Sequence, residues 1–122
     1  MSESTNAGQA TSDALLDLAV EGWRIARLFS RVLTKLDAGE GARYVNQVRY
    51  FTKRVEESLE GAGLRLVNLE GQPYDTGMPA TALNIEDFAP EDDLYVDQVL
   101  EPVIMGPQGV VKTGTIMLRK ID

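Results

Sequence analysis

The side chains in this sequence that could do chemistry are mainly carboxylates. The densest group stands in the segment Glu86-Asp-Phe-Ala-Pro-Glu-Asp-Asp93. Carboxylates can bind calcium, but an EF-hand loop places its ligands at alternate positions around a central glycine, and this segment does neither. We therefore interpret it as a solvated acidic loop. The segment Gly106-Pro-Gln-Gly109 lacks the Gly-Lys-Ser/Thr ending of a phosphate-binding loop, so we interpret it as a hairpin turn.

The residues that the sequence lacks restrict the chemistry further, because it contains no histidine and no cysteine. Ser-His-Asp catalysis, Cys-His catalysis and His-based zinc sites are therefore excluded. Disulfides and thiolate metal sites are excluded as well. An enzyme would need a mechanism that uses carboxylates alone, and no obvious pair stands in the sequence. We expect a protein that is not an enzyme and that binds no cofactor and no metal.

Charge and hydropathy limit the partners. The sequence has 19 acidic and 12 basic side chains, and its formal net charge of -7 repels a phosphate backbone, so nucleic acid is not an expected partner. No apolar run approaches the roughly 18 residues of a membrane-spanning helix, so we expect one small soluble domain and no membrane partner. Residues 1–10 lack a secretory signal pattern, which together with the missing cysteines predicts a cytoplasmic protein.

A heptad pattern predicts a long first helix. Residues 1–11 are small and polar and are predicted to form a disordered tail, and Ser12 or Asp13 then offers an N-cap. Apolar or small residues follow at alternating steps of three and four, namely Leu15, Leu18, Gly22, Ile25, Phe29, Val32 and Leu36. A second apolar row beside them includes Leu16, Trp23 and Leu33. A helix with two adjoining apolar rows is suited to contact two neighbours.

A second helix is predicted from about residue 42 to residue 61. Lys35 and Gly39 are typical of the end of the first helix, and the apolar face of the second consists of Tyr44, Val48, Phe51, Val55 and Leu59. Because the connection is short, the two helices must pack antiparallel, so residues 12–62 are predicted to form a helical hairpin.

The two apolar rows allow two interpretations of the hairpin. It can be a self-association surface that forms a four-helix bundle in a homodimer, or its rows can be the internal seam of a monomer packed on its own sheet. We expect the homodimer, because one partner helix cannot cover both rows. The predicted dimer interface consists of Leu15, Leu16, Leu18, Trp23, Ile25, Phe29, Val32, Leu36, Val48, Phe51 and Val55.

Residues 63–122 are predicted to form a small β domain. The candidate strands are residues 64–69, 81–85, 94–100 and 110–118, and the last two form a hairpin through residues 105–109. The predicted fold class is therefore α+β. An N-terminal antiparallel helical hairpin, which becomes a four-helix bundle on dimerisation, precedes a small β domain.

The order of these segments resembles the GrpE family, the nucleotide exchange factors of Hsp70 chaperones. The matching segments are Leu28-Phe-Ser-Arg-Val-Leu-Thr-Lys-Leu-Asp37, the helix ending Leu59-Glu-Gly-Ala-Gly63, the turn Gly71-Gln-Pro-Tyr-Asp75, and the last β segment from Val96 to Leu118. The sequence departs from the family pattern at Pro79-Ala-Thr-Ala82, Gly106-Pro-Gln-Gly109 and Lys112-Thr-Gly-Thr115. The resemblance implies a homodimeric co-chaperone whose β domain binds an Hsp70-type ATPase and promotes ADP release.

The residues expected to contact that partner lie in the β domain, and each also has a structural interpretation. They are Tyr74, Asp75, Met78, Met105, Lys112 and Arg119. A Gly-Pro turn can need its residues for backbone reasons alone, loop methionines can fill a core, and basic residues can protect a sheet edge. The alternative function is a structural or assembly protein that oligomerises through its helices and binds an unrelated protein through its β domain.

Overall fold

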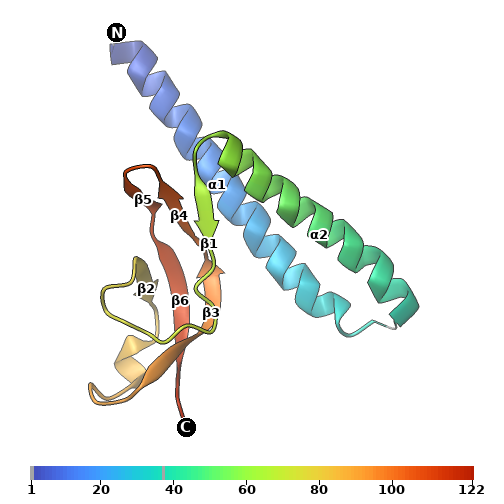
Figure 1. The fold of residues 1–122 in the computed structure, drawn as a ribbon, viewed down its shortest axis with the longest axis vertical. Helices are drawn as coiled ribbons and strands as arrows, with labels where there is room; N and C mark the ends of the chain where they lie inside the picture. The colour runs from blue at the N-terminus through green and yellow to red at the C-terminus, as the bar shows by residue number, and fades with distance from the viewer. Residues whose placement is uncertain (1, 37) are drawn as a thin grey trace. The chain divides into compact units, whose positions relative to one another are not determined.

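A computed structural model of the protein describes residues 2–36 and 38–122, with side chains from Gly8 onward. The chain divides into two compact units, Met1–Ser58 and Leu59–Asp122. Two helices come first and two small sheets follow, so the predicted α+β class with an N-terminal helical hairpin and a β domain is confirmed (Figure 1).

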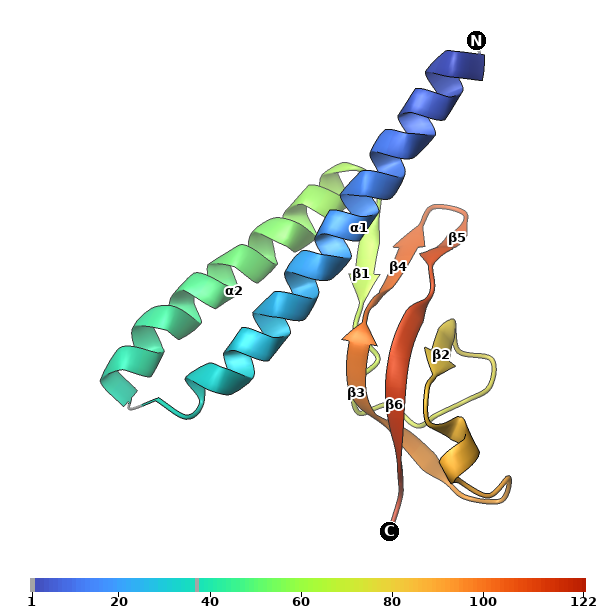
Figure 2. The ribbon, with the colours of Figure 1, turned by 180° about the vertical axis from the view of Figure 1, so that it is seen from behind.

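The helices α1 (Ser2–Leu33) and α2 (Ala38–Gly61) form an antiparallel hairpin and run side by side in Figures 1 and 2; the first unit contains this hairpin except for the residues of α2 after Ser58. A methyl group at Gly22 would lie 3.1 Å from Cζ of Phe51, and one at Gly41 would lie 3.3 Å from the carbonyl oxygen of Leu33. The two glycines therefore let the helices approach closely. The end of α1 at Leu33 lies near the start of α2 at Gly41, as an antiparallel pair requires.

Both helices begin earlier than predicted. α1 begins at Ser2, so the prediction of a disordered tail is wrong for residues 2–11, while Met1 lies outside the described residues. The sequence before Ser12 is polar but contains no proline, and adding residues to an existing helix costs far less than nucleating one. α2 begins at Ala38 instead of about residue 42, and Glu40 in its first turn suits the positive end of the helix dipole.

The first sheet of the β unit has the strand order β1-β4-β5, and both strand pairs are antiparallel. Its strands are β1 (Arg65–Val67), β4 (Val103–Gly106) and β5 (Gly109–Lys112). The chain enters β1 through Gly63, whose φ of 76° lies in the left-handed region and ends α2 as a glycine after a helix usually does.

The second sheet has the order β2-β6-β3, with β6 in the centre (Figure 2). Its strands are β2 (Ala80–Ala82), β3 (Leu94–Glu101) and β6 (Gly114–Lys120); β2 is parallel to β6 and β3 is antiparallel to it. The predicted strand over residues 81–85 is shorter, because a 3-10 helix (Ile85–Asp87) follows β2.

The predicted hairpin over residues 94–118 exists but is divided between the two sheets. Pro102 separates β3 from β4, and Thr113 separates β5 from β6. Val96, Val103, Ile104 and Ile116 are at most 1% exposed and form the centre of the core around this division. Proline cannot donate a ladder hydrogen bond, so the ribbon bends where Pro102 stands and serves both sheets.

Replacing Gly114 with alanine is expected to destabilise the β unit. The added methyl group would lie 2.8 Å from the carbonyl oxygen of Glu101 and 3.1 Å from Cγ2 of Val103, so the backbone must move. Overpacking of this kind costs about 1–3 kcal/mol. The free energy of unfolding in urea measures it. Gly61→Ala is the control, because a methyl group there has no neighbour within 4 Å; an equal effect of both substitutions would contradict the steric explanation.

Candidate functional site

One candidate surface is an apolar face on the helical hairpin. On α1 it consists of Leu15, Leu18, Ile25, Leu28, Phe29 and Val32, which are 45% to 70% exposed, followed by Leu36. Tyr44 and Phe51 on α2 are exposed as well. We call these nine residues the helical apolar face. Scattered exposed leucines are ordinary on a protein surface, but a row at helical spacing indicates a surface that another protein covers.

The second row of α1 is buried. It consists of Leu16, Val20, Trp23, Ala26 and Leu33, all at most 9% exposed, and the guanidinium of Arg27 lies 5.5 Å from the centre of the Trp23 ring. Leu16 and Trp23 therefore do not belong to the exposed face, and their placement in a dimer interface is corrected. Of the other predicted interface residues, Val48 and Val55 are half-buried, and the remaining seven lie on the helical apolar face.

A second candidate surface lies in the β unit, and its first wall is the segment that contains the Gly-Pro turn. The amide of Tyr74 donates to the carbonyl of Leu94 at 2.8 Å, and residues Gly71 and Gln72 exchange backbone hydrogen bonds with Val96 at 2.8 and 2.9 Å. This segment therefore covers the outer edge of β3. Oδ1 of Asp75 then accepts from the amide of Gly77 at 3.0 Å, which is the turn role that the sequence suggested.

The second wall is the 3-10 helix and the acidic loop after it. The side-chain amide of Asn84 donates to the carbonyl of Leu118 at 2.9 Å and its Oδ1 accepts from the Leu118 amide at 2.8 Å, which fixes the 3-10 helix against β6. Within the loop, Oδ2 of Asp92 accepts from the amide of Ala89 at 2.9 Å. The amide of Ile121 donates to the carbonyl of Asp93 at 2.8 Å and brings the C-terminal segment to the same place.

Between these walls is an open groove of about 780 Å³, which we call the acidic groove. Its apolar lining includes Pro73, Tyr74, Ile85, Phe88, Leu94 and Ile121, and its acidic lining is Asp75, Glu86, Asp92 and Asp93. Ile85 and Ile121 are both more than 40% exposed. Apolar side chains thus face solvent in a groove that is lined with carboxylates, which is an arrangement that could hold an apolar and cationic ligand.

The surroundings of Asp92 lower the pKa of its carboxyl. The hydrogen bond from the Ala89 amide lowers the pKa of its carboxyl below the ordinary 3.8, and Lys120, whose Nζ lies 3.4 Å from Oδ1, acts in the same direction. The carboxylate therefore stays charged and holds the acidic loop closed. Glu86 and Asp93 have no side-chain hydrogen bond or ion pair in the part of the chain described here.

The structure brings together only part of the predicted partner-binding set. Tyr74 and Asp75 line the groove, and Met78 follows in the next turn, where its amide donates to the carbonyl of Asp75 at 3.0 Å. Arg119 lies on β6 opposite Tyr95, with its Nε 3.9 Å from Oδ2 of Asp97.

Met105 and Lys112 do not join these residues. They lie in the first sheet, Met105 opposite both Arg65 and Val110, and Lys112 opposite Ile104. The six predicted partner-binding residues therefore do not form one contact surface on the β unit.

Sequence reasoning missed Ile85, Phe88 and Ile121 as groove residues. A signal was present in the charges: no lysine or arginine stands between Arg65 and Lys112, although that stretch carries nearly half of the acidic side chains of the protein. Such segregation marks a charged surface, but it does not show that apolar residues gather on the same surface.

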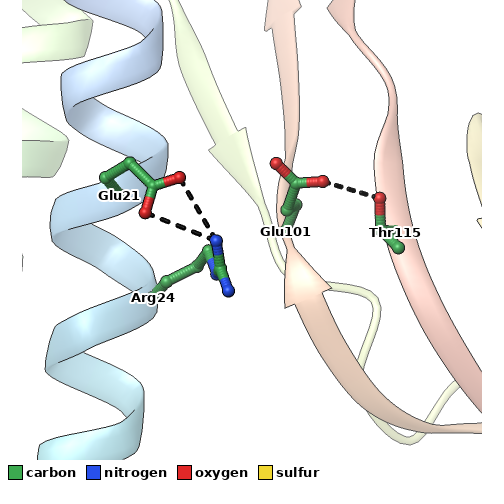
Figure 3. A network of polar contacts seen from close by, with 4 residues as sticks. All are labelled: Glu21, Arg24, Glu101 and Thr115. Carbon is green, nitrogen blue, oxygen red and sulfur yellow. Dashed lines mark hydrogen bonds and ion pairs between the residues drawn. The ribbon is translucent and has the colours of Figure 1, made fainter.

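Other polar contacts have structural roles. In Figure 3, Nη1 of Arg24 donates to both carboxylate oxygens of Glu21 on α1 at 3.2 and 3.3 Å. Separately, the hydroxyl of Thr115 on β6 donates to Oε1 of Glu101 on β3 at 2.8 Å. The first is an exposed ion pair of small energetic weight, and the second joins a cross-strand pair that is already in register.

Comparison with known protein families, curated proteins and solved structures finds no match to this chain. None of the described helices is long and apolar enough to cross a membrane. No group of three possible metal-ligating side chains was found among the described residues.

We expect Asp92→Asn to weaken the β unit and to flatten its acid dependence. Because the pKa of Asp92 is lowered on folding, its contribution is present above the ordinary value of 3.8 and is lost as the pH falls below that value. Urea unfolding at neutral pH and at several points from about pH 4 to pH 2 measures the difference. Asp87→Asn is the control, because its carboxylate makes no hydrogen bond or ion pair in the described part of the chain. Identical pH profiles for the wild type and Asp92→Asn would contradict the assignment.

Proposed function

We propose that this protein is a GrpE-like adaptor: a homodimer, held together by its helical hairpins, whose β unit binds an Hsp70-type ATPase and promotes ADP release. The observation that carries the proposal is the helical apolar face, which is exposed in a chain whose β unit forms a compact unit of its own. Self-association and partner binding are thus assigned to separate parts of the chain.

The occupant of the helical apolar face that fits best is a second copy of the same face. Two copies related by a twofold axis bring four helices together and cover the exposed rows of both, which is the packing of a four-helix bundle. Phe51 supports this placement, because its ring lies against Gly22 between the two helices and remains 43% exposed beside the row of α1.

Nucleotide exchange needs no bond chemistry from the adaptor. A protein that binds the open form of an ATPase domain more tightly than the closed form shifts the population towards the open form, from which ADP escapes faster. This role fits a chain without histidine and cysteine. It also fits a β unit whose candidate surface is an open groove. We place the protein, with its proposed partner, in the cytoplasm.

Introducing two lysines into the helical apolar face is expected to dissociate the dimer. Leu18→Lys with Ile25→Lys places two charges where apolar contact is proposed, and the two side chains are 70% and 60% exposed in one chain, so folding of the hairpin is not at risk. Light scattering should give twice the chain mass of 13.4 kDa for the wild type and the mass of one chain for the variant.

The matched control for this experiment is Val110→Lys with Val111→Lys on β5, which adds the same charges at exposed apolar positions outside the helices. Circular dichroism checks that all variants keep their helices. A wild-type protein with the mass of one chain would contradict the dimer.

The exchange role predicts that the protein accelerates release of a fluorescent ADP analogue from the ATPase domain of an Hsp70-type chaperone by about tenfold or more, which corresponds to about 1.4 kcal/mol of preference for the open form. Tyr74→Ser should reduce the acceleration of release several-fold, while light scattering should still give the mass of a dimer.

Tyr50→Ser is the control for the release experiment, since it removes the same ring from an exposed position on α2. No acceleration by an intact wild-type dimer would count against the exchange role and would leave the assembly-protein alternative, in which the β unit binds a different protein.

A further inference from the structure

We propose that the acidic groove binds a basic amphipathic segment of a protein partner, with lysine or arginine side chains meeting Glu86 and Asp93 and apolar side chains meeting Ile85, Phe88 and Ile121. The inference assumes from the proposed function only that the β unit binds a protein. It does not depend on which protein this is.

The charge of the groove selects the class of ligand. Asp92 is already paired with Lys120, and Asp75 is engaged with the amide of Gly77, but Glu86 and Asp93 lack such partners in the described part of the chain. A cationic ligand can therefore gain two ion pairs without breaking any that exist. Nucleic acids and anionic membrane surfaces carry the same negative charge as the groove and are repelled by it.

The apolar lining selects an amphipathic ligand over a simple cation. Ile85 and Ile121 are 41% and 48% exposed, and Phe88 and Tyr74 are half-buried beside them. Covering these side chains removes apolar surface from water, which contributes to affinity in proportion to the area covered. Charges at the edge of such a contact steer the partner and fix its orientation more than they add affinity.

The openness of the groove favours a segment of a protein over a small molecule. Small-molecule sites bury most of the surface of the ligand, whereas this groove is bounded on two sides by the segments 73–76 and 85–93 and is open to solvent. Its walls are fixed before binding by the backbone bonds of Tyr74 and Ile121 and by the side-chain bonds of Asn84. A preformed groove avoids part of the entropy cost of ordering on association.

The test uses a fluorescein-labelled peptide of about twelve residues made of lysine, leucine and serine, and two counterparts. In one counterpart glutamate replaces lysine, and in the other serine replaces leucine. Fluorescence anisotropy with the full-length protein should show binding of the first peptide only. Amide resonances of the 15N-labelled protein should shift mainly in residues 73–76, 85–94 and 121.

Two charge-neutralising variants make the test specific. Glu86→Gln with Asp93→Asn should weaken binding of the basic peptide by about tenfold. Glu56→Gln with Glu60→Gln, which removes the same two charges from α2, should change it by less than about twofold. Ile85→Ser with Ile121→Ser should also weaken binding of the basic peptide. The dependence of its affinity on salt concentration should stay that of the wild type, because the carboxylates are unchanged.

The inference is overturned if the wild type does not bind the basic peptide, if both neutralised pairs weaken binding equally, or if the resonance shifts centre on the helices. None of these outcomes depends on ADP release. If the protein binds the peptide but does not accelerate ADP release, the groove assignment stands and the exchange role is lost. If it accelerates ADP release but does not bind the peptide, the exchange role stands and the groove assignment is lost.

Discussion

The bend in the ribbon that runs from β3 to β6 is the constraint on which the β unit depends. Pro102 ends β3, and Gly114 lies so close to the carbonyl of Glu101 that no side chain fits between them. One long hairpin can therefore supply strands to both sheets and enclose Ile104 and Ile116 completely. A β unit this small has few apolar residues to bury, so sharing one ribbon between two sheets gives it a single core instead of two inadequate ones.

The acidic groove is a consequence of that arrangement. Because β6 is central in its sheet and ends at Lys120, opposite Leu94 at the start of β3, its end can hold the acidic loop through Asp92 and can present Ile121 beside it. Asn84 holds the 3-10 helix against β6, because its side chain forms two hydrogen bonds with the backbone of Leu118, as a neighbouring strand would. The carboxylates and the exposed apolar side chains thus stand on a rigid frame, which is what a preformed binding surface needs.

The hairpin presents a different kind of surface. Its α1 helix carries one apolar row that is buried and another that is exposed, and Gly22 in the second of these rows allows close approach of Phe51. The exposed row has the length and spacing of a helix-packing surface and carries no catalytic or metal-binding group. This row can pack against another apolar surface, as the proposed dimer requires.

Much of the architecture could be predicted from the sequence, because the signals are local. Heptad spacing identified the helices, Gly63 marked the end of α2, and alternation identified β3 and the ribbon after it. Gly39 was expected at the end of the first helix, but α1 ends at Leu33 and Gly39 lies in the first turn of α2. The residues before Ser12 were misjudged, since polarity alone does not prevent a helix from extending when no proline interrupts it.

The sequence by itself determined that this chain has no histidine or thiol chemistry, that two helices precede a β domain, and that acidic residues gather after Arg65. Only the tertiary structure decided which apolar row of α1 is buried, because neighbouring rows differ by one position and both are apolar. It also decided that Ile85, Phe88 and Ile121 share a groove with Tyr74 and that Met105 does not. Those residues are far apart in the chain. The backbone bonds of Tyr74 to Leu94 and of Ile121 to Asp93, together with the side-chain bonds of Asn84 to Leu118, bring them to one place.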